Sequence, residues 1–281
     1  MSPARVDAEV IATGLSVPEG PVVLGDGRVA FVEQTRGAVS IYDDGTVETI
    51  YQGPGALNAV TLGPDGALYG AQNGGVVGAW RAKARAEPGI ERIDLAGTRS
   101  VVTTVIAGVG LRAPNDLVFG PDGRLYVTDP AEPYDPDRRA ETNRIFAWDG
   151  SSGEVLIELP PSYTNGLVFG LDGSLFWAES YHRAVCMLDG ASREVVCRLP
   201  DTHLPDGMAC AADGTLYVAT VTSHGITVLS PDGEIVDHLF LDDSALPTNC
   251  CFDGTTLWVT DFGVGFETSV TGRLWRVETG S

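Results

Sequence analysis

Short apolar runs alternate with glycine-containing turns along the whole chain. Runs such as Arg124–Thr128 and Ser174–Ala178 are rich in apolar and aromatic residues, and each follows an Asp-Gly pair. An Asp-Gly pair between two apolar runs favours a tight β-hairpin, because glycine adopts the positive φ that the turn requires. Long stretches with the 3.6-residue period of an amphipathic helix are missing. The pattern therefore predicts many short antiparallel strands.

One phrase recurs six times, and it consists of a polar residue, an apolar segment and an Asp-Gly turn. The six phrases begin at Glu19, Asn58, Asn115, Asn165, Asp206 and Asn249. Further strand-like runs follow most copies, which gives about four strands per repeat. Repeats of this size and number are typical of radial β-architectures. We therefore predict an all-β fold, a six-bladed β-propeller with four-stranded antiparallel blades.

The two ends of the chain complement each other. The last repeat ends one strand short, and the strand-like segment Ala8–Ala12 near the N-terminus is not part of any repeat. We predict that this N-terminal strand closes the last blade and hides its edge. Residues 1–281 then form a single propeller domain. Two insertions, Arg81–Thr104 and Pro130–Asn143, interrupt the repeat spacing, and loops on a rigid scaffold often shape a site.

Charge and hydropathy exclude several classes of protein. The chain has 18 Lys and Arg residues against 38 Asp and Glu residues, a net charge of −20, which argues against nucleic-acid binding. The segment Met1–Asp7 lacks the apolar core of a secretory signal, and no run approaches the ~18 apolar residues of a membrane span. We expect a cytoplasmic protein that does not bind membranes. Its charge favours a monomer or a weak homo-oligomer.

The polar residue that opens each phrase stands just before the innermost strand of its blade, so the six positions meet at one mouth of the central channel. By hairpin geometry, the residues seven positions after the turn aspartates lie at the same end. They include Asp129 and Glu179. Taken singly, each polar residue is also explained as a turn former. Together they predict a cation site, because clustered carboxylates repel one another unless a cation relieves the charge.

The chemistry of the ring restricts the cation. Carboxylate and amide oxygens suit one divalent ion, Ca²⁺, Mg²⁺ or Mn²⁺, with Zn²⁺ also compatible. Three histidines, His182, His203 and His224, border the same mouth on blades four and five. They are either solvated loop residues or groups that contact a substrate or relay protons. Arg138 and Arg139 of the second insertion are in turn either solvated or contacts for an anionic group.

Four short motifs carry a resemblance to a known family. They are Val17–Pro21, Pro114–Asp116, Thr164–Gly166 and Leu204–Met208. In this order they resemble the regucalcin/gluconolactonase family of six-bladed propellers, over about residues 11–277. The resemblance implies a single divalent cation held by Glu19, Asn165 and Asp206. It also implies that Asn115 lies beside the metal and contacts it or the substrate, and that Asp206 is the general base.

The resemblance also implies a reaction, the hydrolysis of sugar lactones to aldonic acids. Members with other lactone substrates and relatives without hydrolytic activity exist. Sugar-lactonase members commonly carry an arginine where this chain has Ala113, so a sugar substrate loses one expected contact. No G-x-S-x-G segment, dinucleotide fingerprint or Walker loop offers another chemistry.

We therefore expect a metal-dependent hydrolase that opens a small lactone, with the cation as Lewis acid and Asp206 as general base. The candidate substrate-binding residues are Asn115, Asp129, Glu179, His182, His203 and His224. The alternatives are a non-catalytic propeller that binds calcium or a small ligand, a repeat-type interaction platform, and a different metal-dependent reaction on a non-sugar substrate.

Overall fold

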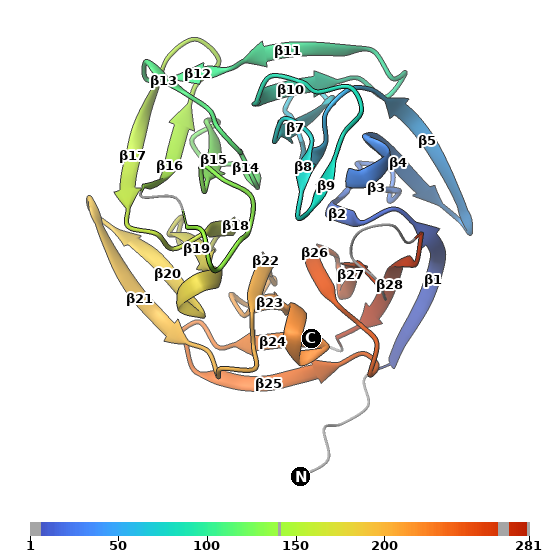
Figure 1. Ribbon diagram of the computed structural model, residues 1–281. Coiled ribbons are helices and arrows are strands. Elements are labelled where there is room, and N and C mark those ends of the chain that lie inside the picture. Colours follow the sequence, from blue (N-terminus) through green and yellow to red (C-terminus); the bar gives the residue numbers. More distant parts are fainter. Residues whose placement is uncertain (1–6, 140–141, 264–269, 280–281) are drawn as a thin grey trace.

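The protein is a ring of blades around a central axis in its computed structural model (Figure 1). The structure describes residues 7–139, 142–263 and 270–279. Within these residues the chain forms six four-stranded antiparallel sheets and two small hairpins. The described residues contain no helix that is long and apolar enough to cross a membrane. Residues 1–6, on which the expectation about a secretory signal rests, lie outside the described residues.

Each blade runs from an inner strand at the channel to an outer strand at the rim. Blades one and two comprise β2 (Pro18–Val23), β3 (Val29–Glu33), β4 (Ala38–Asp43) and β5 (Thr46–Gln52), then β6 (Leu57–Leu62), β7 (Leu68–Gln72), β10 (Gly89–Ile93) and β11 (Arg99–Thr103). Blades three and four comprise β14 (Leu117–Phe119), β15 (Leu125–Asp129), β16 (Asn143–Trp148) and β17 (Gly153–Leu159), then β18 (Thr164–Phe169), β19 (Leu175–Glu179), β20 (Ala184–Asp189) and β21 (Ser192–Arg198). Blades five and six comprise β22 (Pro205–Cys210), β23 (Leu216–Thr220), β24 (Gly225–Leu229) and β25 (Ile235–Phe240), then β26 (Pro247–Asp253), β27 (Thr256–Asp261), β28 (Gly272–Glu278) and β1 (Asp7–Leu15).

The first and last strands of the chain close the ring. β1 pairs antiparallel with β28, with Val10 opposite Trp275 and Ala8 opposite Val277. In Figure 1 the blue N-terminal strand lies beside the red C-terminal strands. This pairing confirms the predicted six-bladed propeller and its closure by an N-terminal strand. It covers the edge that β28 would otherwise expose.

Burial along a blade explains why its strands differ in sequence. The second strands are buried at every position, as in β3 and β19, or at all positions but one, as in β7 and β27, because both of their faces pack against neighbouring blades. The outermost strands alternate exposed and partly buried residues, as in β5. The Asp-Gly turns of the six phrases connect inner to second strands, and their glycines have φ between 59° and 90°, which a side chain would disfavour. The predicted hairpin turns are confirmed.

The first insertion differs from the sequence prediction. The segment Arg81–Thr104 supplies β10 and β11, the two outer strands that blade two needs to complete its sheet. The additional chain lies instead in the short hairpin of β8 (Val76–Val77) and β9 (Trp80–Arg81) and in that of β12 (Val105–Ile106) and β13 (Val109–Gly110). Spacing alone misplaced the insertion, because it could not separate blade strands from the loops beside them.

Candidate functional site

The polar residues that open the six phrases converge at one end of the channel. Five of them line a single cavity of about 820 Å³, a volume that includes its open mouth: Glu19, Asn58, Asn115, Asn165 and Asp206. The sixth, Asn249, lies behind them, and its Nδ2 donates to Oδ2 of Asp116 at 3.3 Å. The convergence that the repeat pattern predicts is therefore present in the structure.

A local irregularity sets the position of these residues. At the start of β18, Thr164 pairs with Glu179 and Leu167 pairs with Trp177, so the inner strand carries one residue more than its partner. The same irregularity occurs in β2, β6, β22 and β26, each of which carries one residue more than its partner strand at this point. A β-bulge of this kind turns a side chain away from the regular alternation, and bulges are frequent beside functional sites.

Close approach of neighbouring inner strands explains the glycines that follow three of the site residues. A Cβ on Gly166 would lie 2.4 Å from the Cα of Gly207, and a Cβ on Gly207 would lie 2.0 Å from Cγ of Asn249. Both distances are far shorter than a van der Waals contact. Only glycine lets the inner strands crowd closely enough to bring the polar residues together.

Two carboxylates, Glu19 and Asp206, line the cavity, and a third, Asp116, is close enough for its charge to act on both. Glu19 and Asp116 are buried, and Asp206 is partly exposed to the cavity. Burial raises the pKa of Asp206 to about 8, with a further contribution from the negative charge of Asp116. Burial and the charges of Asp206 and Asp116 raise the pKa of Glu19 well above its usual range. The pKa of Asp116 is raised by burial to about 6.

The cavity carboxylates differ from most other buried acids of the chain in having no basic partner. Four buried acids pair with an arginine: Glu33 with Arg36, Glu91 with Arg99, Glu179 with Arg193, and Asp261 with Arg273. Glu19, Asp116 and Asp206 have no Lys, Arg or His nitrogen within 4.0 Å in the described part of the chain. Amide groups take that place. The backbone N–H of Gly20 donates to Glu19, Nδ2 of Asn249 donates to Asp116 at 3.3 Å, and the Asn165 side chain favours the charged form of Asp206. Negative charge at this site is therefore left without a protein counter-charge.

The site also contains an unsatisfied polar atom. Oδ1 of Asn115 is buried and has no hydrogen-bond partner among the described residues. Nδ2 of Asn165 donates to Oγ of Ser180 at 3.1 Å, and that hydroxyl donates to the carbonyl of Pro205 at 2.8 Å. This chain of hydrogen bonds fixes the orientation of the Asn165 amide. A buried acceptor without a donor costs free energy unless a ligand satisfies it.

These observations fit a divalent cation that is bound partly by amide oxygen. In the described ranges, no three His, Cys, Asp or Glu side chains form a group that could hold a metal ion. The set Glu19, Asn165 and Asp206 contains only two carboxylates, so an amide ligand would have to complete it. Hard cations accept such mixed oxygen ligands. The residues present thus have the right chemistry for the ion.

Asp116 is a member of the cluster that the sequence prediction missed. It follows Asn115 directly, and its Oδ1 accepts from the backbone N–H of Leu117 at 2.8 Å. The third phrase is the only one of the six in which an acidic residue occupies this second position. That departure from the repeat was the available signal.

The structure does not bring Asp129 and Glu179 to the cavity. The Asp129 carboxylate accepts from the backbone N–H groups of Arg112, Ala113 and Ala131 at 2.8–3.0 Å. It thereby ties the loop that enters its blade to the second strand. Three hydrogen-bonded N–H groups satisfy the carboxylate, although burial still raises its pKa. Asp129 is an anchor for a loop in this geometry.

Glu179 is held in a different polar network. Its carboxylate accepts from Arg193 at 2.6 and 2.7 Å and from the indole N–H of Trp177 at 3.1 Å. Glu179 is opposite Thr164 rather than Asn165 in the sheet, and successive side chains on a strand point to opposite faces. Hydrogen bonds from Arg193 and His182 lower its pKa in spite of burial.

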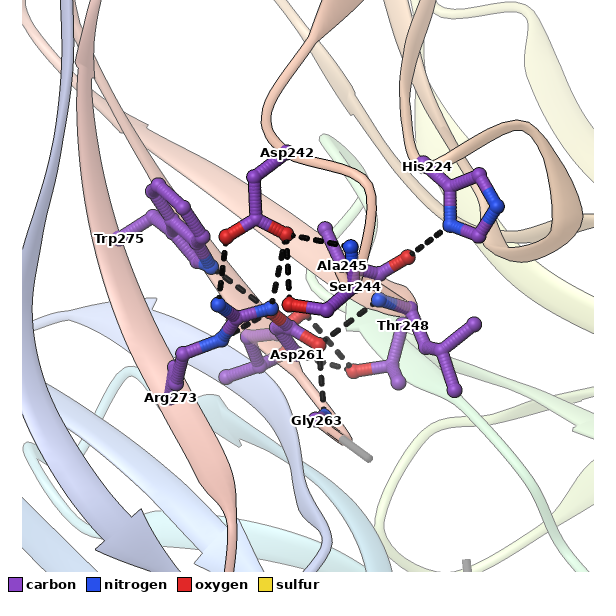
Figure 2. Close-up of polar contacts among 11 residues, drawn as sticks. His224, Asp242, Ser244, Ala245, Thr248, Asp261, Gly263, Arg273 and Trp275 are labelled. Carbon is purple, nitrogen blue, oxygen red and sulfur yellow. Dashed lines mark hydrogen bonds and ion pairs between the residues drawn. The ribbon is translucent and has the colours of Figure 1, made fainter. Parts of the chain in front are cut away.

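Asp261 makes the same kind of network in blade six (Figure 2). Its carboxylate accepts from the N–H groups of Leu246 and Gly263 and from the side chains of Arg273 and Trp275, all at 2.7–2.8 Å. Arg273 also pairs with Asp242. The acids at the ends of the second strands therefore hold blades and entering loops together. This role is close to that of a turn former, the alternative explanation for single polar residues at strand ends.

The three histidines do not line the cavity either. Nδ1 of His182 lies 2.7 Å from Oε2 of Glu179, and Nδ1 of His203 lies 2.8 Å from Oγ1 of Thr227. Nδ1 of His224 lies 2.7 Å from the carbonyl of Ala245, as Figure 2 shows. Each ring is engaged in a contact within the protein. Their assignment as substrate-binding residues stays a prediction that this geometry does not support.

The second insertion forms one wall of the cavity. Pro133 and Tyr134 line it, and the Tyr134 ring packs against Tyr163 at 5.1 Å and against Tyr181 at 5.1 Å. The guanidinium of Arg139 stacks on the Tyr181 ring at 4.5 Å. Arg139 thus holds an aromatic cluster in place.

The fold and the site together define a class of protein: a six-bladed propeller with an acidic cavity at one mouth of its channel. The chain matches the SMP-30/Gluconolactonase/LRE-like region over residues 17–262 and belongs to that family. This match confirms the resemblance that the four motifs carry. Family membership leaves the reaction open, as the relatives below illustrate.

Three similar proteins have different descriptions. A gluconolactonase of Zymomonas mobilis is 28% identical over 293 residues, covering 90% of this chain and 78% of that protein. A virginiamycin B lyase of Nocardia farcinica is 26% identical over 233 residues, covering 82% of this chain and 72% of the lyase. The structure of regucalcin from Agrobacterium tumefaciens, described as a calcium-binding protein, superposes with a TM-score of 0.79 at 15% identity, covering 99% of this chain and 97% of regucalcin.

Proposed function

We propose that this protein is a lactonase that uses one divalent cation, held by Glu19, Asn165 and Asp206, to open a small lactone to its hydroxy acid. The observation that carries the proposal is that Glu19 and Asp206 line the cavity close to Asp116, and that none of the three has a basic partner in the described part of the chain. A cation supplies the missing positive charge. The similarity to a gluconolactonase supports the choice of a lactone as substrate.

The residues divide the work of hydrolysis. When bound, a divalent cation would act as a Lewis acid and polarise the lactone carbonyl. The Asp206 carboxylate takes a proton from the attacking water, whose oxygen forms a bond to the carbonyl carbon. The bond from that carbon to the ring oxygen then breaks, and the proton passes from Asp206 to the ring oxygen. One water is consumed and one hydroxy acid is formed.

Asn115 has a positioning role in this proposal. Its buried Oδ1 lacks a donor, and its Nδ2 donates to the hydroxyl of Tyr163 at 3.5 Å. The free acceptor suits an O–H group of water or substrate that enters the cavity. Asn115 would thus orient the attacking water or a substrate hydroxyl without donating or accepting a proton in the reaction.

A pH-indicator assay tests the proposal. Metal-depleted protein is supplied with Ca²⁺, Mg²⁺, Mn²⁺ or Zn²⁺ in turn and with aldonolactones, simple γ- and δ-lactones and aromatic lactones. We expect acid release with at least one cation, and a loss of about 10²- to 10⁴-fold in Asp206→Asn, the usual contribution of a general base. The exposed turn variant Asp232→Asn in the same blade is the control and should match the wild type.

Two results would contradict the proposal. One is acid release by Asp206→Asn at the wild-type rate. The other is binding of lactones without turnover under every cation, which would favour the non-catalytic ligand-binding propeller.

A further inference from the structure

The cavity has two chemically distinct parts. Its lining falls into two groups: the acids and amides described above, here called the floor, and a set of aliphatic and aromatic side chains from loops and strand ends, here called the wall. Among these are Val77, Tyr134, Tyr163, Leu204 and Phe262. Ligand pockets usually combine an apolar wall with a few polar groups that fix orientation. The division of this cavity therefore indicates how a substrate lies in it.

Packing makes the apolar wall a built feature of the fold. Val77 and Phe262 are 7% and 8% exposed and belong to one buried cluster with Val17 and Ala56. The Tyr134 ring meets Tyr163 edge to face, at an interplanar angle of 89°. Val77 lies in the β8–β9 hairpin, Tyr134 in the second insertion, and Phe262 directly after β27, the second strand of blade six.

Charge at the cavity selects against an anionic substrate. Within the described residues, the side chains that line it include no Lys, Arg or His, whereas Glu19, Glu132 and Asp206 are acidic. Arg112 lies close by, but its guanidinium is 3.6 Å from the Glu132 carboxylate. Ala113 lines the cavity with a methyl group. An anionic substituent is therefore disfavoured, and the apolar side chains of the wall offer no partner to a charged group of either sign.

The wall also disfavours a polyhydroxylated substituent. Each buried sugar hydroxyl needs a hydrogen-bond partner, and an unpaired one costs free energy. The side chains of Val77, Leu204 and Phe262 offer no such partner. The amides of Gln34 and Asn73, which also line the cavity, both donate to Oδ1 of Asn58, at 2.8 and 3.5 Å, and are thus engaged with one another. Asn115 marks the boundary, because its amide donates to the Tyr163 hydroxyl on the wall while its Oδ1 belongs to the floor.

We propose that the substrate is an uncharged lactone with an aromatic or alkyl substituent, which packs on the wall formed by Val77, Tyr134 and Phe262 while its carbonyl lies at the acidic floor. This inference rests on the proposed lactonase function and specifies its substrate class. In the reaction, water adds to the carbonyl carbon, the bond from that carbon to the ring oxygen breaks, and the ring oxygen is protonated. The product is a hydroxy acid with an apolar substituent.

The test compares three δ-lactones of one ring size. Dihydrocoumarin carries a fused benzene ring, δ-nonalactone carries an alkyl chain, and glucono-δ-lactone carries hydroxyls. With the activating cation present, we expect kcat/KM for the first two to exceed that for the sugar lactone at least tenfold, the scale on which an apolar pocket discriminates. A preference below tenfold, or a preference for the sugar lactone, would overturn the inference and leave the proposed lactonase function standing.

Variants of the wall give a second measurement. Tyr134→Ser should raise KM for dihydrocoumarin roughly tenfold while kcat changes less than about threefold, because the ring contributes binding before and during the reaction. Tyr134→Phe keeps the ring and should retain the wild-type KM. Val77→Thr keeps the shape of the side chain and serves if Tyr134→Ser does not fold. Val236→Ser, at an exposed position on β25, is the control. An unchanged KM in both wall variants would overturn the inference.

Binding of a lactam separates the two proposals. The lactam of dihydrocoumarin, 3,4-dihydro-2-quinolinone, has the same shape but is not opened, and its binding is measured by calorimetry. If no lactone is hydrolysed with any cation, yet the lactam binds and Tyr134→Ser weakens its binding about tenfold, the proposed reaction fails and the apolar ligand class is supported. If the lactam does not bind, the inference is overturned.

Discussion

The carboxylates of this protein take different roles because of their partners. Glu179 lies on the second strand of blade four, and Asp206 lies on the inner strand of blade five. Glu179 is paired with Arg193 and its pKa is lowered, whereas Asp206 has amide partners and a pKa raised to about 8. A paired buried acid contributes to the fold. An acid that is buried without a counter-charge instead reduces stability and is a candidate for function.

Replacement of a paired acid should affect stability and not turnover. Glu179→Gln leaves the Arg193 guanidinium without its counter-charge, which should lower the free energy of unfolding by about 1.5–3 kcal/mol, the usual contribution of a hydrogen bond to a charged group. Urea denaturation measures this change. Lactone opening at 25 °C should stay within about twofold of the wild type. A selective loss of turnover with unchanged stability would instead make Glu179 a substrate-binding residue.

The raised pKa of Asp206 predicts a pH-dependent stability of the metal-free protein. In the unfolded chain this carboxyl ionises near its ordinary pKa of 3.8, and in the folded protein at about 8. Between these values the folded state holds more protons, so its stability falls as pH rises, by at most about 1.4 kcal/mol per pH unit for one group. Below pH 3.8 this loss disappears, since the carboxyl is protonated in both states.

Calcium should reverse this loss. Thermal melts with and without Ca²⁺ should differ more at pH 8 than at pH 5, because only the ionised carboxylates need the cation. The comparison with Asp206→Asn isolates this group from the other titrating residues, and the variant should show a flatter pH dependence. An equal calcium effect at both pH values in the wild type would contradict the account.

Residue types and their spacing were enough to predict the polar ring, since five of its six members line the cavity. The same reasoning could not assign Asp129 and Glu179. Spacing placed them at the correct end of the blade, but it could not show that backbone N–H groups and Arg193 already occupy their carboxylates. The repeat pattern does not indicate Asp116, because this acid stands next to the repeated position and occurs in one phrase only.

Individual elements contribute to the site through the geometry of the inner strands. Each bulge places one extra residue on the inner strand at the mouth of the channel, as between Thr164 and Leu167. The glycine after the site residue then permits the neighbouring strand to approach. Sequence patterns predict the strands well, because alternation and Asp-Gly turns are local signals. The bulges depend on packing between blades, and local signals do not contain them.

Crowding of the inner strands makes Gly207 a sensitive position. In Gly207→Ala the new Cβ would lie 2.0 Å from Cγ of Asn249, so the Asn249 amide must move. We expect a loss of about 1–3 kcal/mol in the free energy of unfolding, typical of overpacking, measured by urea denaturation. The variant should also bind the cation more weakly, because the Asn249 amide donates to Asp116 and favours the charged form of Glu19.

Gly25→Ala is the matched control for this prediction. Its Cβ would meet no atom within 4 Å, so the variant should unfold within about 0.5 kcal/mol of the wild type. Equal stability of the Gly207→Ala and Gly25→Ala proteins would show that the inner strands are less crowded than described.

The whole molecule was the most predictable level. Six copies of one phrase and a missing strand in the last repeat indicated a closed ring, and the pairing of β1 with β28 confirms it. The ring brings Glu19 of the first blade beside Asp206 of the fifth, residues that are far apart in the chain. The sequence indicated the second insertion, which lines the cavity with Pro133 and Tyr134, as a loop that shapes a site. The parts contributed by the β8–β9 hairpin and by Phe262 were not predicted, because they carry no periodic signal.

The central claim is that these distant residues hold one divalent cation on which lactone opening depends. Its most direct test is a titration of metal-depleted protein with the activating cation, in which the rate of lactone opening is followed against cation added per protein. The account predicts a rate that rises from background and saturates at one equivalent, and no rise in Glu19→Gln. A metal-depleted protein that opens lactones at the full rate before any cation is added would contradict it.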